Sequence, residues 1–443
     1  MLYYGNDGKT YNTTKLIGKG GEGEVFDIVE DPDKVIKIFK KTSLEMALKM
    51  QALTKDFQWS EFVSNNTMFP LAALYTNRAC TGECVGYVMR RLKSQEMLLD
   101  VYNHPDNMIS IYNQACIAMN ISRLVKEIHY IGYSEGRYNV VIGDFNQKNI
   151  FVDRRTGNVQ LTDADSFHVN VKYRGKLRTL KCKALLAELF FVPELVRSCN
   201  TPNGKVNLEN VEGETFTIYT DYFLLAYHVH MLLLGVQPYG LERICKSYDD
   251  SESVPSPPGR ETLATAGNYV YTNVYGGYKV PKRYPDFNIL TPRLQGLFKR
   301  AFQDGASEPR IRPTAEEFEI ALNEYISQLD YCYCSGWDHY LLHSYNKNYC
   351  EWCRVEHESN YKRIFYSRNA RYMTEQELLH CLEINLKNSF KGEVCYVLAK
   401  RCVRYDKQRA KEYFFKALNY FGNDPQEGVR RRIDMINGEL AVL

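Results

Sequence analysis

The 443-residue sequence has few of the features that assign a chain at once to a broad class. No apolar run approaches the roughly 20 residues that a helix needs to span a bilayer. The first residues, MLYYGNDGKTYN, show no positively charged start followed by an apolar core, so no secretory signal is evident. The formal net charge of +3 is small for this length and gives no electrostatic reason to expect nucleic acid. We therefore expect no membrane partner and no nucleic-acid partner.

A disulfide framework is not indicated either. The chain has 13 cysteines, an odd number, and most of them are scattered singly through apolar surroundings. This distribution favours buried thiols in a reducing compartment, which predicts a cytoplasmic protein. The composition, 44% hydrophobic and 25% charged, is that of a folded globular chain. The length predicts two or three domains.

The composition changes close to residue 330. Four cysteines and two histidines gather in YCYCSGWDHYLLHSYNKNYCEWC, residues 331–353. From about Thr374, apolar residues recur at helical spacing in ELLHCLEINL, EVCYVLAKRCV and AKEYFFKALNYF, a pattern that suggests stacked helix hairpins. We therefore predict a large body, a compact Cys/His module and a small helical tail.

A glycine-rich segment opens the body. LIGKGGEGEV, residues 16–25, places Gly18, Gly20 and Gly23 in the spacing G-x-G-x-x-G, which lets backbone amides approach phosphates but is common by chance. A dinucleotide-binding unit would continue with a helix. This sequence continues instead with a strand, a DPD turn and a second apolar strand that carries Lys37. That order resembles the phosphate cover of a protein kinase. The alternative for Lys37 is an edge strand with its ammonium group in water.

A second motif lies in IGDFNQKNI, residues 142–150. Asp144 and Asn149 stand five residues apart, and Asp163 follows the strand-like segment VQLT. Taken alone the stretch favours a turn, because Asp, Asn and Gly build turns. The same residue types nevertheless suit phosphoryl transfer, which requires two metal ligands and a proton-accepting carboxylate around a nucleoside triphosphate.

Over roughly residues 10–328 the chain resembles the eukaryotic-type protein kinases, because several motifs occur in the order of that family. Asp144 and Asn149 match the catalytic-loop motif H-R-D-x-x-x-x-N, and Asp163 matches the metal-binding Asp of D-F-G. Further motifs follow in order: Pro193 and Glu194 at the place of A-P-E, Asp221 at the start of the buried large-lobe helix, and Arg312, whose family counterpart pairs with the A-P-E Glu.

The resemblance implies an α+β, bilobal protein-kinase-like fold followed by a small zinc-ribbon-like module and an α-helical tail. The implied units are a kinase small lobe at 1–92, a kinase large lobe at 93–330, the Cys/His zinc module at 331–357 and the helical tail at 370–443.

The resemblance also implies ATP and Mg²⁺ as cofactors and a role for each residue of the nucleotide site. The loop of Gly18, Gly20 and Gly23 would cover the phosphates, and Lys37 would neutralise the α- and β-phosphates. A helix-borne Glu would hold that lysine. Glu45 is the candidate, since no other acid lies in the amphipathic stretch SLEMALKMQAL.

In the same way, the resemblance implies that Asp144 orients the incoming hydroxyl and accepts its proton, while Asn149 and Asp163 hold Mg²⁺. GYVMRRL, residues 86–92, is similar to the last small-lobe strand and hinge. Met89 would then be the gatekeeper, with plain core packing as the alternative, and the backbone near Arg91 would contact adenine.

Departures from the family pattern limit these roles. Ile142 and Gly143 replace H-R, so the pocket that receives an activation-segment phosphate is not expected. Asn146 replaces the Lys that follows the catalytic Asp, which leaves open whether Lys148 reaches the γ-phosphate. Asp165 stands where D-F-G has Gly. We interpret it as a structural cap, with an extra metal ligand or a shifted register as alternatives.

One branch of the family is more similar, a group of bacterial Ser/Thr kinases that carries GGEGEV, K-I-F, G-Y-x-M and a C-x4-H-x10-C-x2-C module. It implies a structural Zn²⁺ in a tetrahedral site. The implied ligands are Cys334, His339, Cys350 and Cys353, with Cys332 and His343 as competitors. Reduced thiols at two hairpin ends are the alternative. The group also implies two partners, a metal-dependent protein phosphatase and a von Willebrand A-domain protein.

These features predict an ATP-dependent protein kinase that phosphorylates Ser or Thr hydroxyls in a bacterial-type signalling or stress module. The alternative is a nucleotide-binding pseudokinase adaptor that uses the zinc module and helical tail for interactions. A small-molecule phosphotransferase is a further alternative, since such enzymes often carry G-D-x-x-x-x-N. Against it stand the expected pair of Arg312 with Glu194 and the full activation segment, residues 163–194.

Overall fold

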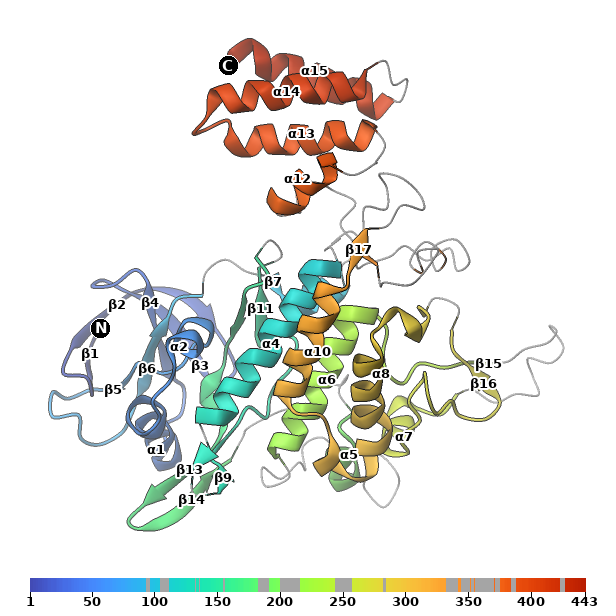
Figure 1. Cartoon of the computed structure of the whole chain (residues 1–443). Coiled ribbons are helices and arrows are strands. Elements are labelled where there is room, and N and C mark those ends of the chain that lie inside the picture. The colour runs from blue at the N-terminus through green and yellow to red at the C-terminus, as the bar shows by residue number, and fades with distance from the viewer. Residues whose placement is uncertain are drawn as a thin grey trace.

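The structure is a computed structural model. It describes residues 1–92, 96–103, 111–131, 133–134, 136–153, 156–181, 191–199, 216–243, 257–281, 284–331, 342–343, 351, 354, 370, 375–383, 388–422 and 427–443. These residues form a strand-rich N-terminal lobe, a larger lobe built mainly of helices and, beyond it, a helical tail (Figure 1). The predicted α+β content is therefore confirmed.

Six strands of the small lobe close into a barrel in the order β1-β2-β3-β4-β6-β5. They are β1 (Leu2–Gly5), β2 (Thr10–Lys19), β3 (Gly23–Ile28), β4 (Lys34–Phe39), β5 (Ala72–Tyr75) and β6 (Gly86–Arg90). Successive side chains of β4 and β6 point to opposite faces of the sheet. Ile36 and Val88 lie opposite each other in the barrel core, whereas Lys37 lies opposite Tyr87 on the other face.

Two short helices, α1 (Leu44–Gln51) and α2 (Glu61–Asn66), complete the small lobe, and a π-helical turn (Ala52–Asp56) extends α1. Ser43 caps α1, since its side chain accepts a hydrogen bond from the Met46 amide. The helix then buries Met46, Lys49 and Met50, while Glu45 stays exposed in its first turn.

The large lobe is organised around α6 (Ile218–Leu234), which is buried along most of its length. It begins at a capping box formed by Thr217 and Thr220 and ends at Gly235, whose φ of 63° suits glycine. α4 (Ile111–Ile131) packs against α6 and against α10 (Ala315–Ser327) (Figure 1). The remaining helices are α3 (Leu98–Asn103), α5 (Pro193–Cys199), α7 (Arg260–Thr265), α8 (Pro292–Lys299) and α9 (Gly305–Ser307).

Short paired strands flank the loops that contain the predicted site residues of the large lobe. β11 (Ile150–Val152) pairs with β12 (Val159–Leu161) and with β7 (Glu96–Met97), and β13 (His168–Tyr173) pairs with β10 (Val140–Val141) and β14 (Lys176–Leu180). Three further pairs are β8 (Tyr133–Ser134) with β9 (Arg137–Tyr138), β15 (Glu242–Arg243) with β16 (Tyr278–Lys279), and β17 (Asp330–Tyr331) with β18 (Leu342–His343). The strand expected at VQLT, with Asp163 after it, is therefore confirmed.

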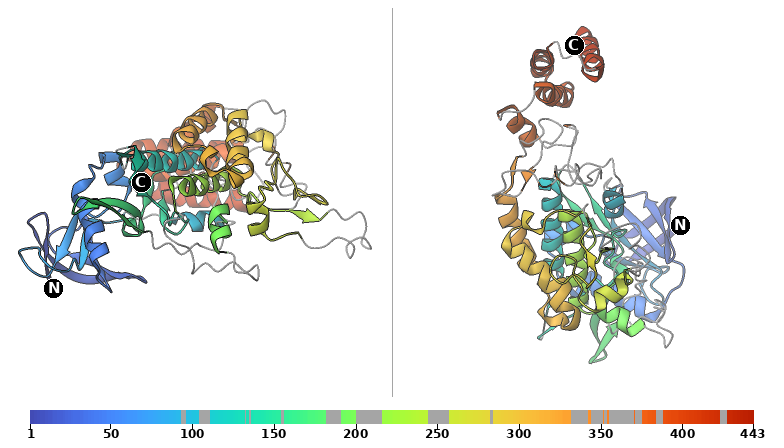
Figure 2. Two further views of the ribbon diagram at one scale, coloured as in Figure 1. Left: turned by 90° about the horizontal axis from the view of Figure 1, so that it is seen from below. Right: turned by 90° about the vertical axis from the view of Figure 1, so that its right-hand side faces the viewer.

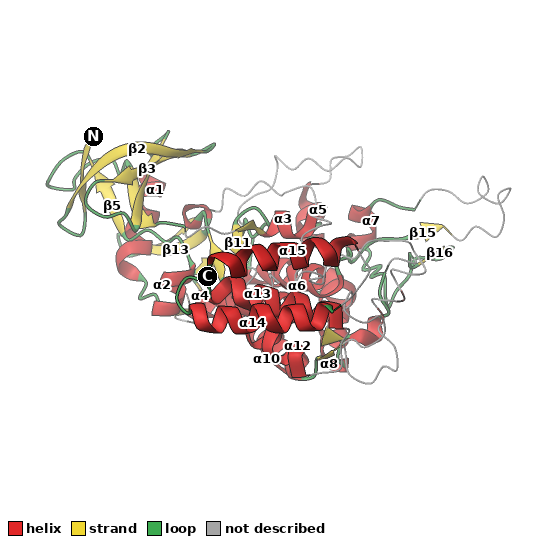
Figure 3. Ribbon diagram, turned by 90° about the horizontal axis from the view of Figure 1, so that it is seen from above, coloured by secondary structure: helices red, strands yellow, loops and turns green. Residues whose placement is uncertain are grey.

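The described residues of the tail form four helices: α12 (Glu375–Glu383), α13 (Asn388–Cys402), α14 (Lys407–Phe421) and α15 (Glu427–Val442). They lie beyond the end of the body at which β17 emerges, and α13, α14 and α15 run side by side (Figures 2 and 3). The tail has a hydrophobic core of its own, which includes Cys395, Phe414 and Phe421. The helices predicted from apolar periodicity are confirmed.

The predicted zinc ligands Cys334, His339, Cys350 and Cys353, and the competing Cys332, lie outside the described residues. His343 belongs to β18, where its backbone pairs with Asp330. The part of the chain that the structure describes contains no group of three or more metal-ligating side chains. Since the proposed ligands are not among those residues, the zinc site stays a prediction. No helix within the described ranges is long and apolar enough to cross a bilayer.

Candidate active site

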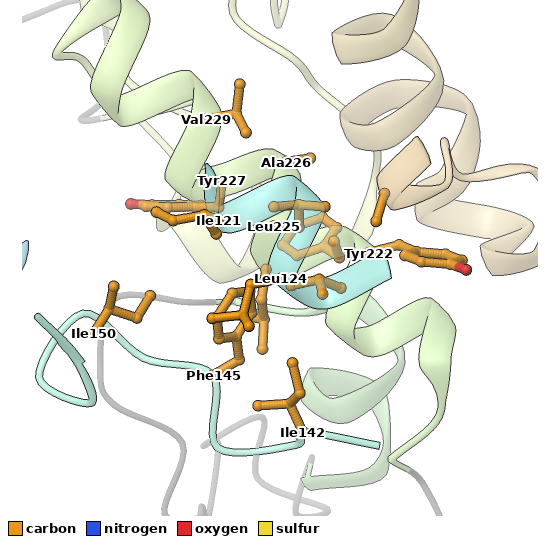
Figure 4. Close-up of a cluster of buried hydrophobic side chains, with 14 of the residues drawn as sticks. Ile121, Leu124, Ile142, Phe145, Ile150, Tyr222, Leu225, Ala226, Tyr227 and Val229 are labelled. Carbon is orange, nitrogen blue, oxygen red and sulfur yellow. The ribbon is translucent and has the colours of Figure 1, made fainter. Parts of the chain in front are cut away.

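The predicted catalytic loop, residues 142–149, is held by buried apolar side chains on both sides of Asp144. Ile142 and Phe145 are buried, and Figure 4 shows them in one cluster with side chains of α4 and α6, including Leu124 and Leu225. Ile150, the first residue of β11, lies in the same cluster. Packing on the rigid helices therefore fixes the loop backbone from which Asp144 projects.

The Asp221 side chain anchors the start of the loop by binding backbone amides of the loop. This carboxylate is fully buried and accepts hydrogen bonds from the amides of Ile142 (2.8 Å) and Gly143 (2.9 Å). His129 Nε2 lies 2.8 Å from the same group. Gly143 has a φ of 72°, a conformation that glycine adopts without strain, which explains why the loop carries glycine directly before Asp144.

His228 anchors the loop on the other side of Asp144. Complete burial lowers the pKa of His228 to about 4, so the imidazole is neutral near pH 7. Its Nε2 lies 2.9 Å from the Phe145 carbonyl oxygen, and its Nδ1 lies 3.1 Å from the Tyr102 hydroxyl. A neutral ring meets both contacts by donating from Nε2 and accepting at Nδ1.

Two amides surround the Asp144 carboxylate. Asn146 Nδ2 donates to Oδ1 (2.7 Å), and Asn149 Nδ2 donates to Oδ2 (3.2 Å) and to the Asp144 carbonyl (3.0 Å). Burial raises the pKa of Asp144, although the two amides oppose that shift. The Asn146 side-chain amide is thus bound to Asp144. The Asn146 Oδ1 accepts a hydrogen bond from the backbone amide of the exposed Lys148 (2.8 Å).

The β11–β12 hairpin brings the two predicted magnesium ligands together. Asn149 directly precedes β11, and Asp163 follows β12 after Thr162. The Thr162 amide donates to the Asn149 carbonyl at 2.9 Å, which extends the hairpin register by one step. An amide oxygen and a carboxylate are the hard oxygen donors that Mg²⁺ prefers, so these two side chains fit the ion.

Lys37 lies in the middle of an acidic network. Its Nζ is 2.8 Å from Asp163 Oδ1 and 2.9 and 2.8 Å from the two carboxylate oxygens of Asp165. Tyr87 donates its hydroxyl to Asp165 Oδ1 at 2.7 Å. Burial lowers the pKa of Lys37, but the charges of Asp165 and Asp163 outweigh that effect and raise it, so the ammonium is permanently charged.

The predicted pairing of Lys37 with Glu45 is wrong in this structure. Glu45 is exposed in the first turn of α1, and within the described ranges Lys37 forms its ion pairs with Asp163 and Asp165. An acid in the first turn of a helix interacts favourably with the helix dipole, which accounts for Glu45 without a catalytic role. Asp165, which was interpreted above as a structural cap, is instead the buried carboxylate that pairs with Lys37.

A pocket of about 340 Å³ opens beside this network. Its lining includes the predicted residues Gly20, Gly23, Lys37, Met89, Arg91 and Asp163, together with Ile17, Val35, Met68, Tyr87 and Thr162. Gly18 is not part of that lining; it lies within β2, opposite Val25 of β3. The Arg91 amide donates to the Asp33 carbonyl at 2.8 Å, so an adenine contact there would require the carbonyl oxygen.

The glycines of the loop differ in how much space surrounds them. A Cβ on Gly23 would lie 2.6 Å from the Ile38 carbonyl oxygen, so the neighbouring strand β4 excludes a side chain there. A Cβ on Gly20 would meet nothing nearer than 3.8 Å, and one on Gly21 would meet nothing within 4 Å. Gly23 is therefore required by strand pairing, while no neighbouring atom crowds the tip of the loop at Gly21.

The predicted ion pair behind the activation segment is confirmed. The buried Arg312 donates to both oxygens of Glu194, at 2.8 and 2.6 Å, and also to the carbonyls of Tyr219 (2.8 Å) and Gly305 (2.9 Å). Its guanidinium lies over the Phe223 ring. Sequence reasoning missed Tyr87 and His228, although Tyr87 falls within the quoted hinge strand and two residues from Met89.

No protein-family model matches the chain. The chain is similar to the protein named protein kinase YegI of Escherichia coli strain K12, with 28% identity over 353 residues that cover 77% of this chain and 48% of the relative. The protein of the same name from Escherichia coli O157:H7 is 27% identical over 366 residues, which cover 80% of this chain and 50% of the relative.

The chain thus spans about half the length of the curated relatives it matches. The similarity supports a relationship to a bacterial protein kinase, which agrees with the resemblance carried by the motifs. The names of the relatives say nothing of zinc, of a phosphatase or of a von Willebrand A-domain protein.

Proposed function

We propose that the chain is an ATP- and Mg²⁺-dependent protein kinase that transfers the γ-phosphoryl group to Ser or Thr hydroxyls. One observation carries the proposal: Lys37 and Asp163 line a pocket under a glycine-rich loop, and the β11–β12 hairpin joins Asp163 to Asn149 and, through it, to Asp144. The residues that we propose to bind phosphate, hold the metal and accept the proton are thereby near one another.

Asn149 and Asp163 would hold Mg²⁺, which when bound would neutralise negative charge between the β- and γ-phosphates. Lys37 would bind the α- and β-phosphates from the opposite wall, and the open tip of the loop at Gly21 would let the backbone approach them, since the Gly20 amide already donates to the Gly23 carbonyl at 2.9 Å. In the structure Lys37 contacts Asp163, so binding of the nucleotide requires this contact to be exchanged for contacts with phosphate and metal.

Asp144 would orient the incoming hydroxyl and accept its proton. Its raised pKa brings it closer to the operating pH and makes it a better proton acceptor than an exposed aspartate. The amides of Asn146 and Asn149 fix the direction of the carboxylate. Lys148 is the one cation of residues 142–149 and is exposed, so it would be the candidate of this loop for a contact with the γ-phosphate.

The alternative function is a nucleotide-binding pseudokinase adaptor that uses the zinc module and helical tail for interactions. The observation that favours it is the occupation of Asp163 by Lys37 at 2.8 Å, together with the missing lysine at Asn146. A wild-type chain that binds ATP but transfers no phosphate above an Asp144→Asn variant would support the adaptor.

The partners and the setting are proposals that rest on resemblance. We propose a protein substrate, a signalling or stress module and, as candidate partners, a metal-dependent protein phosphatase and a von Willebrand A-domain protein. Mixing the purified chain with either protein and measuring binding by sedimentation would test each partner directly.

The deciding experiment incubates the full chain with ATP and Mg²⁺. Self-phosphorylation and phosphorylation of a generic protein substrate are both measured, and the phosphorylated residues are identified by mass spectrometry. Wild type should phosphorylate Ser or Thr, and Asp144→Asn should transfer about 10²- to 10⁴-fold more slowly. Equal rates for the two proteins would contradict the proposed function.

A further inference from the structure

Asp165 and Asp163 share Lys37 but differ sharply in their surroundings. The Asp165 side chain is fully buried, whereas the Asp163 side chain is 42% exposed toward the pocket. A buried carboxylate is costly unless it is paired and hydrogen-bonded. Asp165 meets that requirement only while Lys37 stays beside it, so the geometry ties the two groups together more firmly than it ties Lys37 to Asp163.

Tyr87 fixes the direction of the Asp165 carboxylate. It lies directly opposite Lys37 in the β4–β6 pair and is 1% exposed. Burial and the Asp165 charge raise the pKa of its hydroxyl well above the ordinary value, so it remains a donor to Oδ1 at any relevant pH. Lys37 and Tyr87, on neighbouring strands, therefore bind the same carboxylate.

The helix α1 contacts the same segment through a cation. Lys49 is buried and donates from Nζ to the Asp165 carbonyl (3.0 Å) and to the Lys181 carbonyl (3.2 Å). Glu45, the acid of this helix, points outward to solvent at its first turn. The helix thus holds the backbone of the segment that carries Asp165, and the segment itself supplies the carboxylate for Lys37.

We propose that Asp165 is the residue that positions Lys37 for phosphate binding, in place of an acid on α1. This inference rests on the proposed function. Two consequences follow. Lys37 keeps a partner when Asp163 turns to the metal, so the exchange required for nucleotide binding leaves no uncompensated charge. The site also does not depend on a swing of α1 to bring a carboxylate to Lys37.

The experiment measures ATP binding to the full chain by equilibrium dialysis, without Mg²⁺ and over a series of Mg²⁺ concentrations. Asp165→Asn should weaken Mg²⁺-free binding and raise the Mg²⁺ concentration for half-maximal binding about tenfold, because Lys37 then has Asp163 as its charged partner and competes with the ion. Asp163→Asn should leave Mg²⁺-free binding undiminished, since Asp165 still positions Lys37. The exposed Asp434→Asn, in α15, is the matched control and should behave as wild type.

Glu45→Gln separates this inference from the helix-borne alternative and should change neither quantity. A loss in Glu45→Gln, or Mg²⁺-free binding that falls in Asp163→Asn, would overturn the inference. The melting curve of Asp165→Asn shows whether that variant folds. If it does not fold, the result for Asp163→Asn still tests the inference. A wild type that binds ATP without transferring phosphate would refute the kinase activity while leaving the positioning role intact, whereas a wild type that binds no ATP would refute both.

Discussion

Arg312 binds Glu194 with two parallel hydrogen bonds, and no part of the Arg312 side chain is exposed. The pair joins α5, at the end of the activation segment, to the loop before α10, while the other guanidinium hydrogens bind the Tyr219 and Gly305 carbonyls. A single side chain thereby binds α5 and α6, which are distant from it in sequence, together with the nearby Gly305 carbonyl.

Arg312→Ala should therefore destabilise the protein strongly. Removing one member of a buried ion pair typically costs about 3–5 kcal/mol, because it strands the other charge. We expect the urea midpoint to fall accordingly, measured by circular dichroism. Arg310→Ala, an exposed arginine two residues earlier, is the control and should change stability by less than about 0.5 kcal/mol. Similar midpoints for the two variants would contradict the role of the pair.

The sequence predicted this pair and the positions of Asp144, Asn149 and Asp163 because each belongs to a motif of fixed spacing. The partner of Lys37 was not predictable in that way. Glu45 is the only acid in its helix, but the turn of α1 that buries Met46 and Lys49 leaves Glu45 on the outer side. The actual partner, Asp165, becomes visible only when strands β4 and β6 and the segment after β12 are brought together in space.

Gly23→Ala and Gly21→Ala should differ in their effects on stability. A Cβ at Gly23 would press on the Ile38 carbonyl at 2.6 Å, where the backbone of β4 has to move. We expect a loss of about 1–3 kcal/mol, the usual cost of overpacking. At Gly21 nothing lies within 4 Å of the added carbon, so thermal stability should be unchanged. Equal melting temperatures for the two variants would show that the loop does not pair as described.

Acid should weaken the fold through two histidines of α6. Burial lowers the pKa of His228 to about 4 and that of His230 to about 3, from an ordinary value of 6.5. Between pH 6.5 and about 4 the unfolded chain binds protons that the folded chain does not, so the free energy of unfolding falls as the pH is lowered through this range. Denaturant titrations at several pH values measure the slope, which His230→Gln should make shallower. A slope unaffected by His230→Gln would contradict its neutral, buried state.

Asp163→Ala should abolish Mg²⁺-dependent phosphoryl transfer without unfolding the protein. The side chain is 42% exposed, and its partner Lys37 keeps Asp165, so little stability depends on it. Transfer depends on it strongly, since the metal that it would hold neutralises the phosphates. Rates are measured over a range of Mg²⁺ concentrations beside Asp434→Ala as control. A variant that retains near-normal rates at every concentration would move the metal ligand elsewhere.

The zinc module should hold one Zn²⁺ per chain, bound by Cys334, His339, Cys350 and Cys353. Three thiolates and an imidazole fill a tetrahedral site and leave no open position, as expected of a structural metal. A segment as short as residues 331–353 buries too little apolar surface to fold alone, so metal binding would supply much of its folding free energy. Elemental analysis of the purified chain measures the zinc content, which Cys350→Ser should lose while Cys395→Ser, in the core of the tail, retains it. Metal-free protein whose module resists protease as well as the native form would refute the site, because the fold would then not need the ion.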